Sequence, residues 1–374
     1  MTIQKTDPAW ARGAISRRRA LQLGAGSALA LSFGALSGGK SMAASEVTLF
    51  TWETYHEPDW VQAYQQASGV KVNVVNTGSV DEMYAQTRSG SVKADVLYFD
   101  TGSFPRYIDA GLIAPFDAAQ VPNRKNVSKT MGWEEKCTVG GKLWGIPYNW
   151  GTQPLMYDKR ATDGEPLTWA ALWDKKYKGK VNMFDDAYIT IPMIALYVGA
   201  ADPFNMSDKE FEEVRKALKA LRPQVRTIAR GFDDATNIYA SGEAVIGYCQ
   251  NIAIVNDLQA KGLPFAYSFP DEGTPTWIDC SVVTEQGNRP EVYSFIDANL
   301  TPEWQVRMTE FSLNNGVLSA EVAEGAGLSG EVIKKTNIAD QAQDGFWDKM
   351  VVFQPPEDID RRLEVWNDFK AGTL

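Results

Sequence analysis

The sequence predicts an α/β fold in which mainly parallel sheets are flanked by helices. Between residues 47 and 110, short runs rich in Val, Phe and Thr alternate with amphipathic runs of helical length. Strands that alternate with helices in this way pair in parallel, because each helix carries the chain back across the sheet. The chain has 374 residues, which is enough for two domains of ordinary size.

The individual elements follow from apolar periodicity and from turn residues. In the first part of the chain, strands are expected at 47–51, 70–75 and 95–99, and helices at 58–67, 80–89 and 104–110, the last ending at Gly111. Later strands are expected at 153–157, 181–184, 244–249, 265–269 and 278–284, and later helices at 189–198, 209–221, 252–261, 290–299, 302–313 and 358–370. No loose Pro/Gly/Ser linker interrupts this series, so two domains would share a tight hinge.

A binding site is expected where two of the first strands end. In open parallel sheets, ligands bind outside the carboxyl ends of the strands. The residues expected there are Trp52, Glu53 and Tyr55 after the first strand, and Asp100, Thr101 and Ser103 after the third. The two loops therefore place aromatic rings beside carboxylates and hydroxyls.

The first 44 residues are typical of a signal peptide of the twin-arginine type. Ser16-Arg17-Arg18-Arg19-Ala20-Leu21 precedes an apolar run that ends at Leu36. This run is shorter than the ~20 apolar residues that a spanning helix needs, although an uncleaved membrane anchor is the alternative. Small residues favour cleavage near Ala43 or Ala44. We therefore expect export to the periplasm.

The net charge limits the classes of ligand and partner, and the cysteine count limits the possible disulfides. The net charge of −10 becomes more negative when residues 1–44 are removed, because this segment carries six basic residues and one acid. An acidic surface argues against a nucleic-acid partner and is compatible with a cationic ligand. Of the three cysteines, we expect Cys249 and Cys280 to pair and Cys137 to remain free.

The residue inventory argues against an enzyme. His56 is the only histidine, so a multi-imidazole metal site is excluded, and no G-x-S-x-G or phosphate-binding glycine motif occurs in the mature part. We therefore expect neither a metal nor a cofactor. The acid pairs Asp185-Asp186, Asp233-Asp234 and Glu134-Glu135 are of a kind found most often in helix caps or solvated turns.

Several motifs, in order along the mature chain, resemble those of the periplasmic spermidine/putrescine-binding proteins of ABC importers. They are Leu49-Phe-Thr-Trp-Glu-Thr-Tyr55, Gly69-Val-Lys-Val, Met83-Tyr-Ala, Ala94-Asp-Val-Leu, Gly111-Leu-Ile, Ile146-Pro-Tyr-Asn-Trp-Gly151, Thr168-Trp-Ala-Ala-Leu-Trp173, Tyr177-Lys-Gly-Lys180, Asp185-Asp-Ala187, Ser241-Gly-Glu-Ala-Val-Ile-Gly247 and Glu272–Asp279. The resemblance covers essentially the whole mature chain.

This resemblance implies a two-lobed protein whose chain crosses the hinge twice. The first lobe would comprise 45–149 plus 279–323, and the second 150–278 plus 324–374. A small organic cation would bind between the lobes, and closure would present a new surface to an inner-membrane ABC permease. The protein would act as a monomer without covalent chemistry.

The resemblance also implies the site residues. Family members neutralise ammonium groups with carboxylates and stack the methylene chain between aromatic rings, as a buried cation requires. Trp52 and Tyr55 match the aromatic pair of the first loop, while Asp100 and Thr101 occupy the loop where small hydroxyls usually lie. Asp186 matches the acid of the second lobe. Trp277 and Asp279 match a Trp-x-Asp pair, and Asp279 would be the principal partner of the amine.

Two positions depart from the family pattern. Ile189 stands where the family has a second acid, and Gln250 stands where it has a tryptophan. Asp100, Glu53 or Asp185 would then supply the second acid. Alternatively, the ligand has one cationic end and one neutral or anionic end that bonds to Gln250 and Asn251.

Other interpretations of these residues remain open. Asp186 would serve equally as the N-cap of the following helix, and Trp52 and Tyr55 as core aromatics. Trp169 and Trp173, which are four residues apart, are more typical of a pair in the core than of ligand contacts. The ligand alternatives are a quaternary amine, an amino-acid derivative or an opine. The functional alternatives are a periplasmic enzyme that uses paired carboxylates and a chemoreceptor adaptor.

Overall fold

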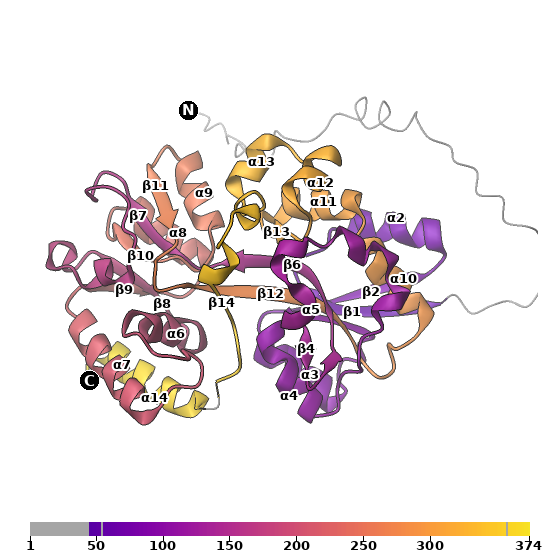
Figure 1. Ribbon diagram of the computed structural model, residues 1–374, viewed down its shortest axis with the longest axis horizontal. Coiled ribbons are helices and arrows are strands. Elements are labelled where there is room, and N and C mark those ends of the chain that lie inside the picture. The colour runs from indigo at the N-terminus through magenta and orange to yellow at the C-terminus, as the bar shows by residue number, and fades with distance from the viewer. Residues whose placement is uncertain (1–44, 54, 357) are drawn as a thin grey trace, which may run out of the picture. The chain divides into compact units, whose positions relative to one another are not determined.

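The computed structural model describes residues 45–374 except 54 and 357 (Figure 1). The predicted signal peptide and its cleavage site at Ala43 or Ala44 lie outside these residues. Within the described part of the chain, the helices are all too short or too polar to cross a bilayer.

The larger sheet contains the predicted βαβαβ unit. Its strand order is β13-β6-β12-β3-β1-β2, with β14 beside β12. The strands are β1 (Glu46–Trp52), β2 (Lys71–Thr77), β3 (Val96–Asp100), β6 (Ile146–Thr152), β12 (Thr274–Val283), β13 (Asn315–Gly316) and β14 (Met350–Val352). The accompanying helices are α2 (Pro58–Ser68), α3 (Val80–Ser89), α4 (Phe104–Asp109), α10 (Pro290–Asn299) and α11 (Pro302–Ser312). β1 pairs in parallel with both β2 and β3, as predicted.

The smaller sheet has the order β11-β7-β10-β8-β9. Its strands are β7 (Leu155–Asp158), β8 (Val181–Phe184), β9 (Val225–Ala229), β10 (Ile246–Tyr248) and β11 (Phe265–Ser268). Its helices are α6 (Ala187–Tyr197), α7 (Asp208–Leu221), α8 (Phe232–Ala240), α9 (Ala253–Ala260) and α14 (Ile359–Ala371). Helices α6, α7 and α14 lie side by side (Figure 1), and they bury Ile191, Leu218 and Trp366 in one apolar cluster with β8.

Shorter elements connect these parts. They are α5 (Trp133–Lys136), the hairpin β4 (Thr138–Val139) and β5 (Lys142–Leu143), α12 (Ala320–Gly325), α13 (Gly330–Lys335), and several 3₁₀ turns that include Thr101–Ser103 and Trp169–Trp173.

Trp169 and Trp173 lie in the core. Trp169 is fully buried, and Trp173 stacks on Tyr197 with ring centroids 3.6 Å apart. The predicted core role of this tryptophan pair is confirmed.

Both sheets are mixed, with more antiparallel pairs than the sequence suggested. β12 runs antiparallel to β3 and β6, and β7 runs antiparallel to β10 and β11. The chain passes from the larger sheet to the smaller one between β6 and β7, and it returns to the larger sheet between β11 and β12. A third connection between the sheets leads from β14 to α14. The predicted lobe limits, 45–149 plus 279–323 and 150–278 plus 324–374, stay predictions.

The prediction that Cys249 pairs with Cys280 is wrong. Cys249 follows β10 in the smaller sheet, whereas Cys280 lies within β12 of the larger sheet, next to Cys137. The sequence could not reveal this arrangement, because the pairing depends on how the two sheets distribute the chain.

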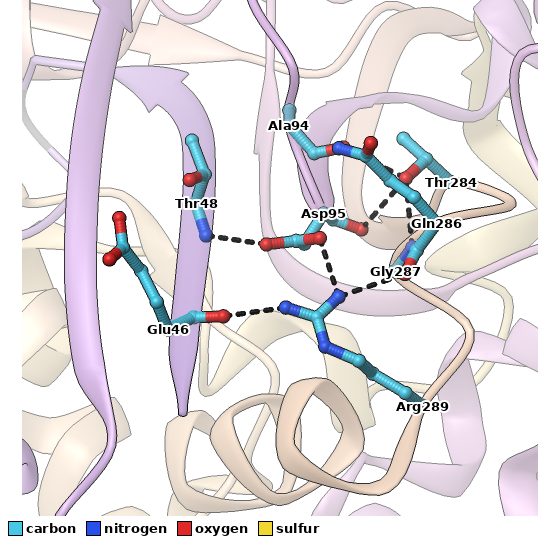
Figure 2. A network of polar contacts seen from close by, with 8 residues as sticks. All are labelled: Glu46, Thr48, Ala94, Asp95, Thr284, Gln286, Gly287 and Arg289. Carbon is cyan, nitrogen blue, oxygen red and sulfur yellow. Dashed lines mark hydrogen bonds and ion pairs between the residues drawn. The ribbon is translucent and has the colours of Figure 1, made fainter. Parts of the chain in front are cut away.

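A polar network fastens the start of β1 to the segment before α10 (Figure 2). Arg289 donates from Nη1 to Asp95 Oδ1 at 2.6 Å and from Nη2 to the carbonyl of Glu46 at 2.5 Å. The other oxygen of Asp95 accepts from the backbone N–H of Thr48 at 2.8 Å. The Asp95 carboxylate is nearly buried, so Arg289 supplies most of its compensation.

We expect Arg289→Ala to destabilise the protein by about 2 kcal/mol, because hydrogen bonds to charged groups contribute about 1.5–3 kcal/mol. The measurement is denaturant unfolding at pH 7. Lys216→Ala is the matched control, since Lys216 forms an exposed ion pair with Glu213 and such pairs contribute about 0–1 kcal/mol. Equal stability of the two variants would contradict the structural role of Arg289.

Candidate functional site

A hydrogen bond between Tyr55 and Asp279 forms the centre of the candidate site. The Tyr55 hydroxyl donates to the Asp279 carboxylate, and the two residues are only 5% and 6% exposed. Asp279 lies within β12, and Tyr55 belongs to the loop after β1. The Tyr148 hydroxyl holds this loop in place by donating to the Tyr55 carbonyl at 2.8 Å.

A second buried carboxylate lies beside the first. Asp100 is the last residue of β3 and is directly opposite Asp279 in the antiparallel pair of β3 with β12. Directly opposed residues point to the same face of a sheet. Ser103 donates to Asp100 Oδ2 at 3.0 Å, whereas Asp100 Oδ1 is buried without a hydrogen-bond partner in the described part of the chain.

The pKa values of both acids are raised. Burial, together with the charge of Asp100, raises the pKa of Asp279 to about 7, although the hydrogen bond from Tyr55 lowers it. Burial also raises the pKa of Asp100, against the opposing effect of the Ser103 hydrogen bond. Two adjacent buried carboxylates repel each other when both are ionised. A cation placed beside them would remove this repulsion.

Trp277 occupies the same face of β12 as Asp279, two residues away. Its ring lies directly on the backbone of Gly151 in β6, where a Cβ atom would come within 2.3 Å of Trp277 Cζ2. Gly151 is therefore required for this ring position. The neighbouring Trp52 is partly buried, and its indole N–H has no hydrogen-bond partner among the described residues.

Asn149 is a site residue that the sequence analysis missed. It lies opposite Asp279 in β6, its hydrogen bonding lowers the pKa of Tyr55 against the dominant effect of burial, and its Oδ1 is buried without a partner in the described chain. The signal was present, because Asn149 falls within the Ile146–Gly151 motif. A strand prediction that avoids Pro, Asn and Gly did not place that motif in a sheet.

Asp186 caps helix α6. Its Oδ1 accepts from the backbone N–H groups of Tyr188 at 2.8 Å and Ile189 at 3.2 Å, so the N-cap interpretation is confirmed. Burial raises the pKa of Asp186. Its second oxygen takes no part in these bonds, so capping leaves Asp186 available to a ligand.

Asp185 is not available as a second acid. Its Oδ1 accepts from Trp366 Nε1 at 3.0 Å and from Lys370 Nζ at 2.8 Å, which binds the carboxylate to helix α14. Glu53 is exposed. Among the three acids considered as substitutes, Asp100 is therefore the one that lies beside Asp279.

The turn after β3 meets the start of α6. A Cβ atom on Gly102 would lie 2.8 Å from the Tyr188 hydroxyl and 2.7 Å from the Phe353 carbonyl. Asp100 and Asp186 both raise the pKa of Tyr188, in addition to the larger effect of burial. Tyr188 therefore lies near Asp100 of the larger sheet as well as near Asp186 of the smaller sheet. Thr101, in the same turn as Gly102, is buried.

Gln250 and Asn251 follow β10. Gln250 Oε1 is buried and has no partner in the described chain, while Asn251 Nδ2 lies 3.5 Å from Asn314 Oδ1. Unpartnered buried atoms are costly. Four of the site residues carry one: Trp52, Asp100, Asn149 and Gln250.

His56 belongs to the core. It stacks on Tyr148 with centroids 5.4 Å apart and planes at 2°, and burial lowers its pKa to about 3. The imidazole is therefore neutral. The described residues contain no group of three or more His, Cys, Asp or Glu side chains placed to hold a metal ion.

Comparison with known proteins identifies the family. The profile of the bacterial extracellular solute-binding proteins matches residues 59–338. The chain belongs to this family. The predicted family resemblance is confirmed by relatives of this solute-binding protein: the spermidine/putrescine-binding periplasmic protein of Escherichia coli is 27% identical over 75% of this chain and 81% of that protein. The putrescine/agmatine-binding protein of Pseudomonas aeruginosa is 26% identical over 76% and 83%, respectively.

A solved structure confirms the fold of this solute-binding protein. The spermidine/putrescine ABC transporter substrate-binding protein of Streptococcus pneumoniae superimposes with a TM-score of 0.74 at 20% identity, over 88% of this chain and 100% of that chain. The predicted two-lobed periplasmic-binding-protein fold is thereby confirmed.

Proposed function

We propose that this solute-binding protein captures a polyamine of the putrescine or spermidine type, or a related small organic cation, for an ABC importer. The observation that carries the proposal is the pair of buried carboxylates, Asp100 and Asp279, on one face of the larger sheet. The names of the relatives in E. coli and P. aeruginosa support the same ligand class.

In this proposal, one ammonium group binds between Asp279 and Asp100. The positive charge allows both carboxylates to ionise, and the free Oδ1 of Asp100 gains a donor. Trp52 and Trp277 would flank the methylene chain, and each aromatic face adds roughly 0.5–2 kcal/mol to cation binding. Tyr55 would orient Asp279 through its hydrogen bond.

A second candidate is a ligand with one ammonium group and one neutral or anionic end. The observation that favours it is Gln250, whose free buried oxygen can accept a hydrogen bond from a neutral hydroxyl or amide group. Fewer acids are also free to bind a second ammonium group, since Asp185 is already paired and position 189 is apolar. A linear diamine would instead rely on the second oxygen of Asp186 at its far end.

Export and delivery of the ligand would follow the pattern of a periplasmic binding protein. The chain would lose residues 1–44 by cleavage near Ala43 or Ala44 on twin-arginine export, act as a monomer in the periplasm, and release the unchanged ligand to an inner-membrane ABC permease. A chemoreceptor adaptor would bind the same ligand, whereas an enzyme using paired carboxylates would convert it. Recovery of unmodified ligand after binding would exclude the enzyme.

A thermal-shift screen of the mature protein tests the ligand class. The panel is putrescine, cadaverine, spermidine, spermine, choline, glycine betaine, γ-aminobutyrate, basic amino acids and sugars. A ligand at a hundred times its Kd stabilises by ~2.7 kcal/mol, so the melting temperature should rise with a linear polyamine. A rise with a zwitterion alone would favour the second candidate, and no rise with any amine would refute the proposal.

We expect Gly151→Ala to weaken polyamine binding about tenfold. The added methyl would overlap the Trp277 ring and displace it, and an aromatic face contributes roughly 0.5–2 kcal/mol to cation binding, where 1.4 kcal/mol is about tenfold in Kd. Isothermal titration with the strongest ligand of the screen measures the loss. Gly325→Ala is the matched control, because a Cβ atom there meets nothing within 4 Å. Unchanged affinity in Gly151→Ala would exclude Trp277 from the ligand contact.

A further inference from the structure

Two of the three cysteines are brought together by the fold. The Sγ atoms of Cys137 and Cys280 lie 3.5 Å apart, and both residues are fully buried. They belong to segments that are far apart in the chain, at the end of α5 and within β12. Cys249 is engaged elsewhere, since its Sγ donates to the Asn251 carbonyl at 3.2 Å.

The backbone around each sulfur is fixed by main-chain hydrogen bonds. The N–H of Cys137 donates to the Trp133 carbonyl at 2.8 Å, and its carbonyl accepts from the Trp144 N–H at 3.0 Å. Cys280 pairs with Phe99 on one side of β12 and with Pro147 on the other. A disulfide would need the sulfurs to approach by about 1.5 Å.

We propose that Cys137 and Cys280 form a disulfide in the exported protein, and that Cys249 remains a free thiol. The setting favours oxidation, because proteins of this extracellular family function where disulfides form and persist. The odd number of cysteines is then explained by one internal bond and one buried thiol.

The oxidant is the disulfide of a periplasmic thiol oxidoreductase. A thiolate of one cysteine attacks it, forming a mixed disulfide and expelling one oxidant thiolate, and the other cysteine then attacks this mixed disulfide and expels the second. The two cysteines lose two protons and two electrons, and the oxidant becomes a dithiol. Because both sulfurs are buried, exchange takes place before the larger sheet closes over them or during its local opening.

The bond would strengthen the strand that carries the candidate site. Cys280 directly follows Asp279, and successive residues of a strand point to opposite faces. The disulfide would therefore anchor β12 from behind, on the face away from Tyr55 and Asp100. Closing so long a loop restricts the unfolded chain strongly.

Thiol counting tests the proposal on the full-length chain exported to the periplasm of a bacterial host. The protein is unfolded in denaturant, alkylated with N-ethylmaleimide before or after reduction, and weighed intact. We expect one adduct without reduction and three after it, with peptide mapping that links Cys137 to Cys280. Three adducts without reduction, or a link that includes Cys249, would overturn the proposal.

Matched variants sharpen the result. Cys249→Ala should retain the linked peptide and show no adduct before reduction, whereas Cys280→Ala should show two adducts. In wild type, reduction in denaturant followed by refolding should lower the melting temperature by at least about 5 °C, and the double variant Cys137→Ala/Cys280→Ala should not respond to reductant. A wild-type melting temperature independent of reduction would contradict the proposal, and the wild-type mapping decides even where a variant fails to fold.

Discussion

Asp279→Asn should weaken the binding of a primary polyamine by about a hundredfold or more. Truncating one partner of a buried, hydrogen-bonded charge pair costs about 2–5 kcal/mol, and every 1.4 kcal/mol is about tenfold in Kd. Asparagine keeps the size of the side chain and an oxygen that accepts from the Tyr55 hydroxyl. Isothermal titration of both proteins gives the ratio of the dissociation constants.

Stability separates this loss from a folding defect. Above pH 7 the ligand-free protein carries a buried Asp279 carboxylate next to Asp100, whose charge helps to raise the Asp279 pKa. Asp279→Asn removes that unfavourable charge, so the ligand-free variant should be at least as stable as wild type at pH 8. Asp185→Asn is the matched control with the opposite pattern. It removes the charge that pairs with Lys370 at 2.8 Å, so it should lower stability and leave the affinity unchanged.

The size of the loss also distinguishes amine classes. Primary ammonium groups donate hydrogen bonds and need the carboxylates, whereas quaternary amines rely mainly on aromatic faces. Asp279→Asn should therefore abolish binding of a primary amine and merely weaken that of a quaternary amine. Wild-type affinity for every ligand in Asp279→Asn would show that the amine binds away from this carboxylate.

The affinity for the amine should fall as the pH drops below about 7. In the ligand-free protein the pKa of Asp279 is about 7, compared with an ordinary value of 3.8. An ammonium ligand requires the ionised carboxylate, so binding below pH 7 must release a proton. We expect Kd to rise about tenfold per pH unit at the acidic limit, since one pKa unit corresponds to 1.36 kcal/mol. Titration at pH 6 in buffers of different ionisation enthalpy should detect close to one released proton.

The same shift affects ligand-free stability with the opposite sign. Between pH 3.8 and about 7 the folded state binds more protons at Asp279 than the unfolded state does, so this group lowers the free energy of unfolding as the pH rises. Asp100→Asn provides the control, because removing the neighbouring charge should lower the Asp279 pKa and move the binding transition to more acidic pH. An affinity that is constant from pH 6 to 8 would mean that Asp279 is ionised before the ligand arrives.

The predicted elements were most accurate where local pattern and tertiary environment agree. Helices α3 and α10 begin and end at the predicted residues, since turn residues and proline punctuate them. β6 was missed, although all its residues are buried. Its Pro147, Asn149 and Gly151 contradict a strand pattern locally, and its pairing with β12 and β13 overrides that preference.

The candidate site shows the same division. The ends of β1 and β3 were predicted to face a ligand, and the structure brings Tyr55 and Asp100 from these loops to Asp279. Asn149, Gly151 and Tyr188 were not predicted, because their proximity to the acids depends on the antiparallel register of β12 and on the approach of α6.

The sequence by itself determined the α/β class, the family and the residue types available to bind an organic cation, because these depend on periodicity and on motifs within short segments. Only the tertiary structure decided which carboxylates meet, which acid is already paired, and which cysteines adjoin. Those outcomes depend on sheet order and register, which bring together residues separated by more than a hundred positions. Local sequence carries no signal for such distances, since the packing of the whole chain selects them.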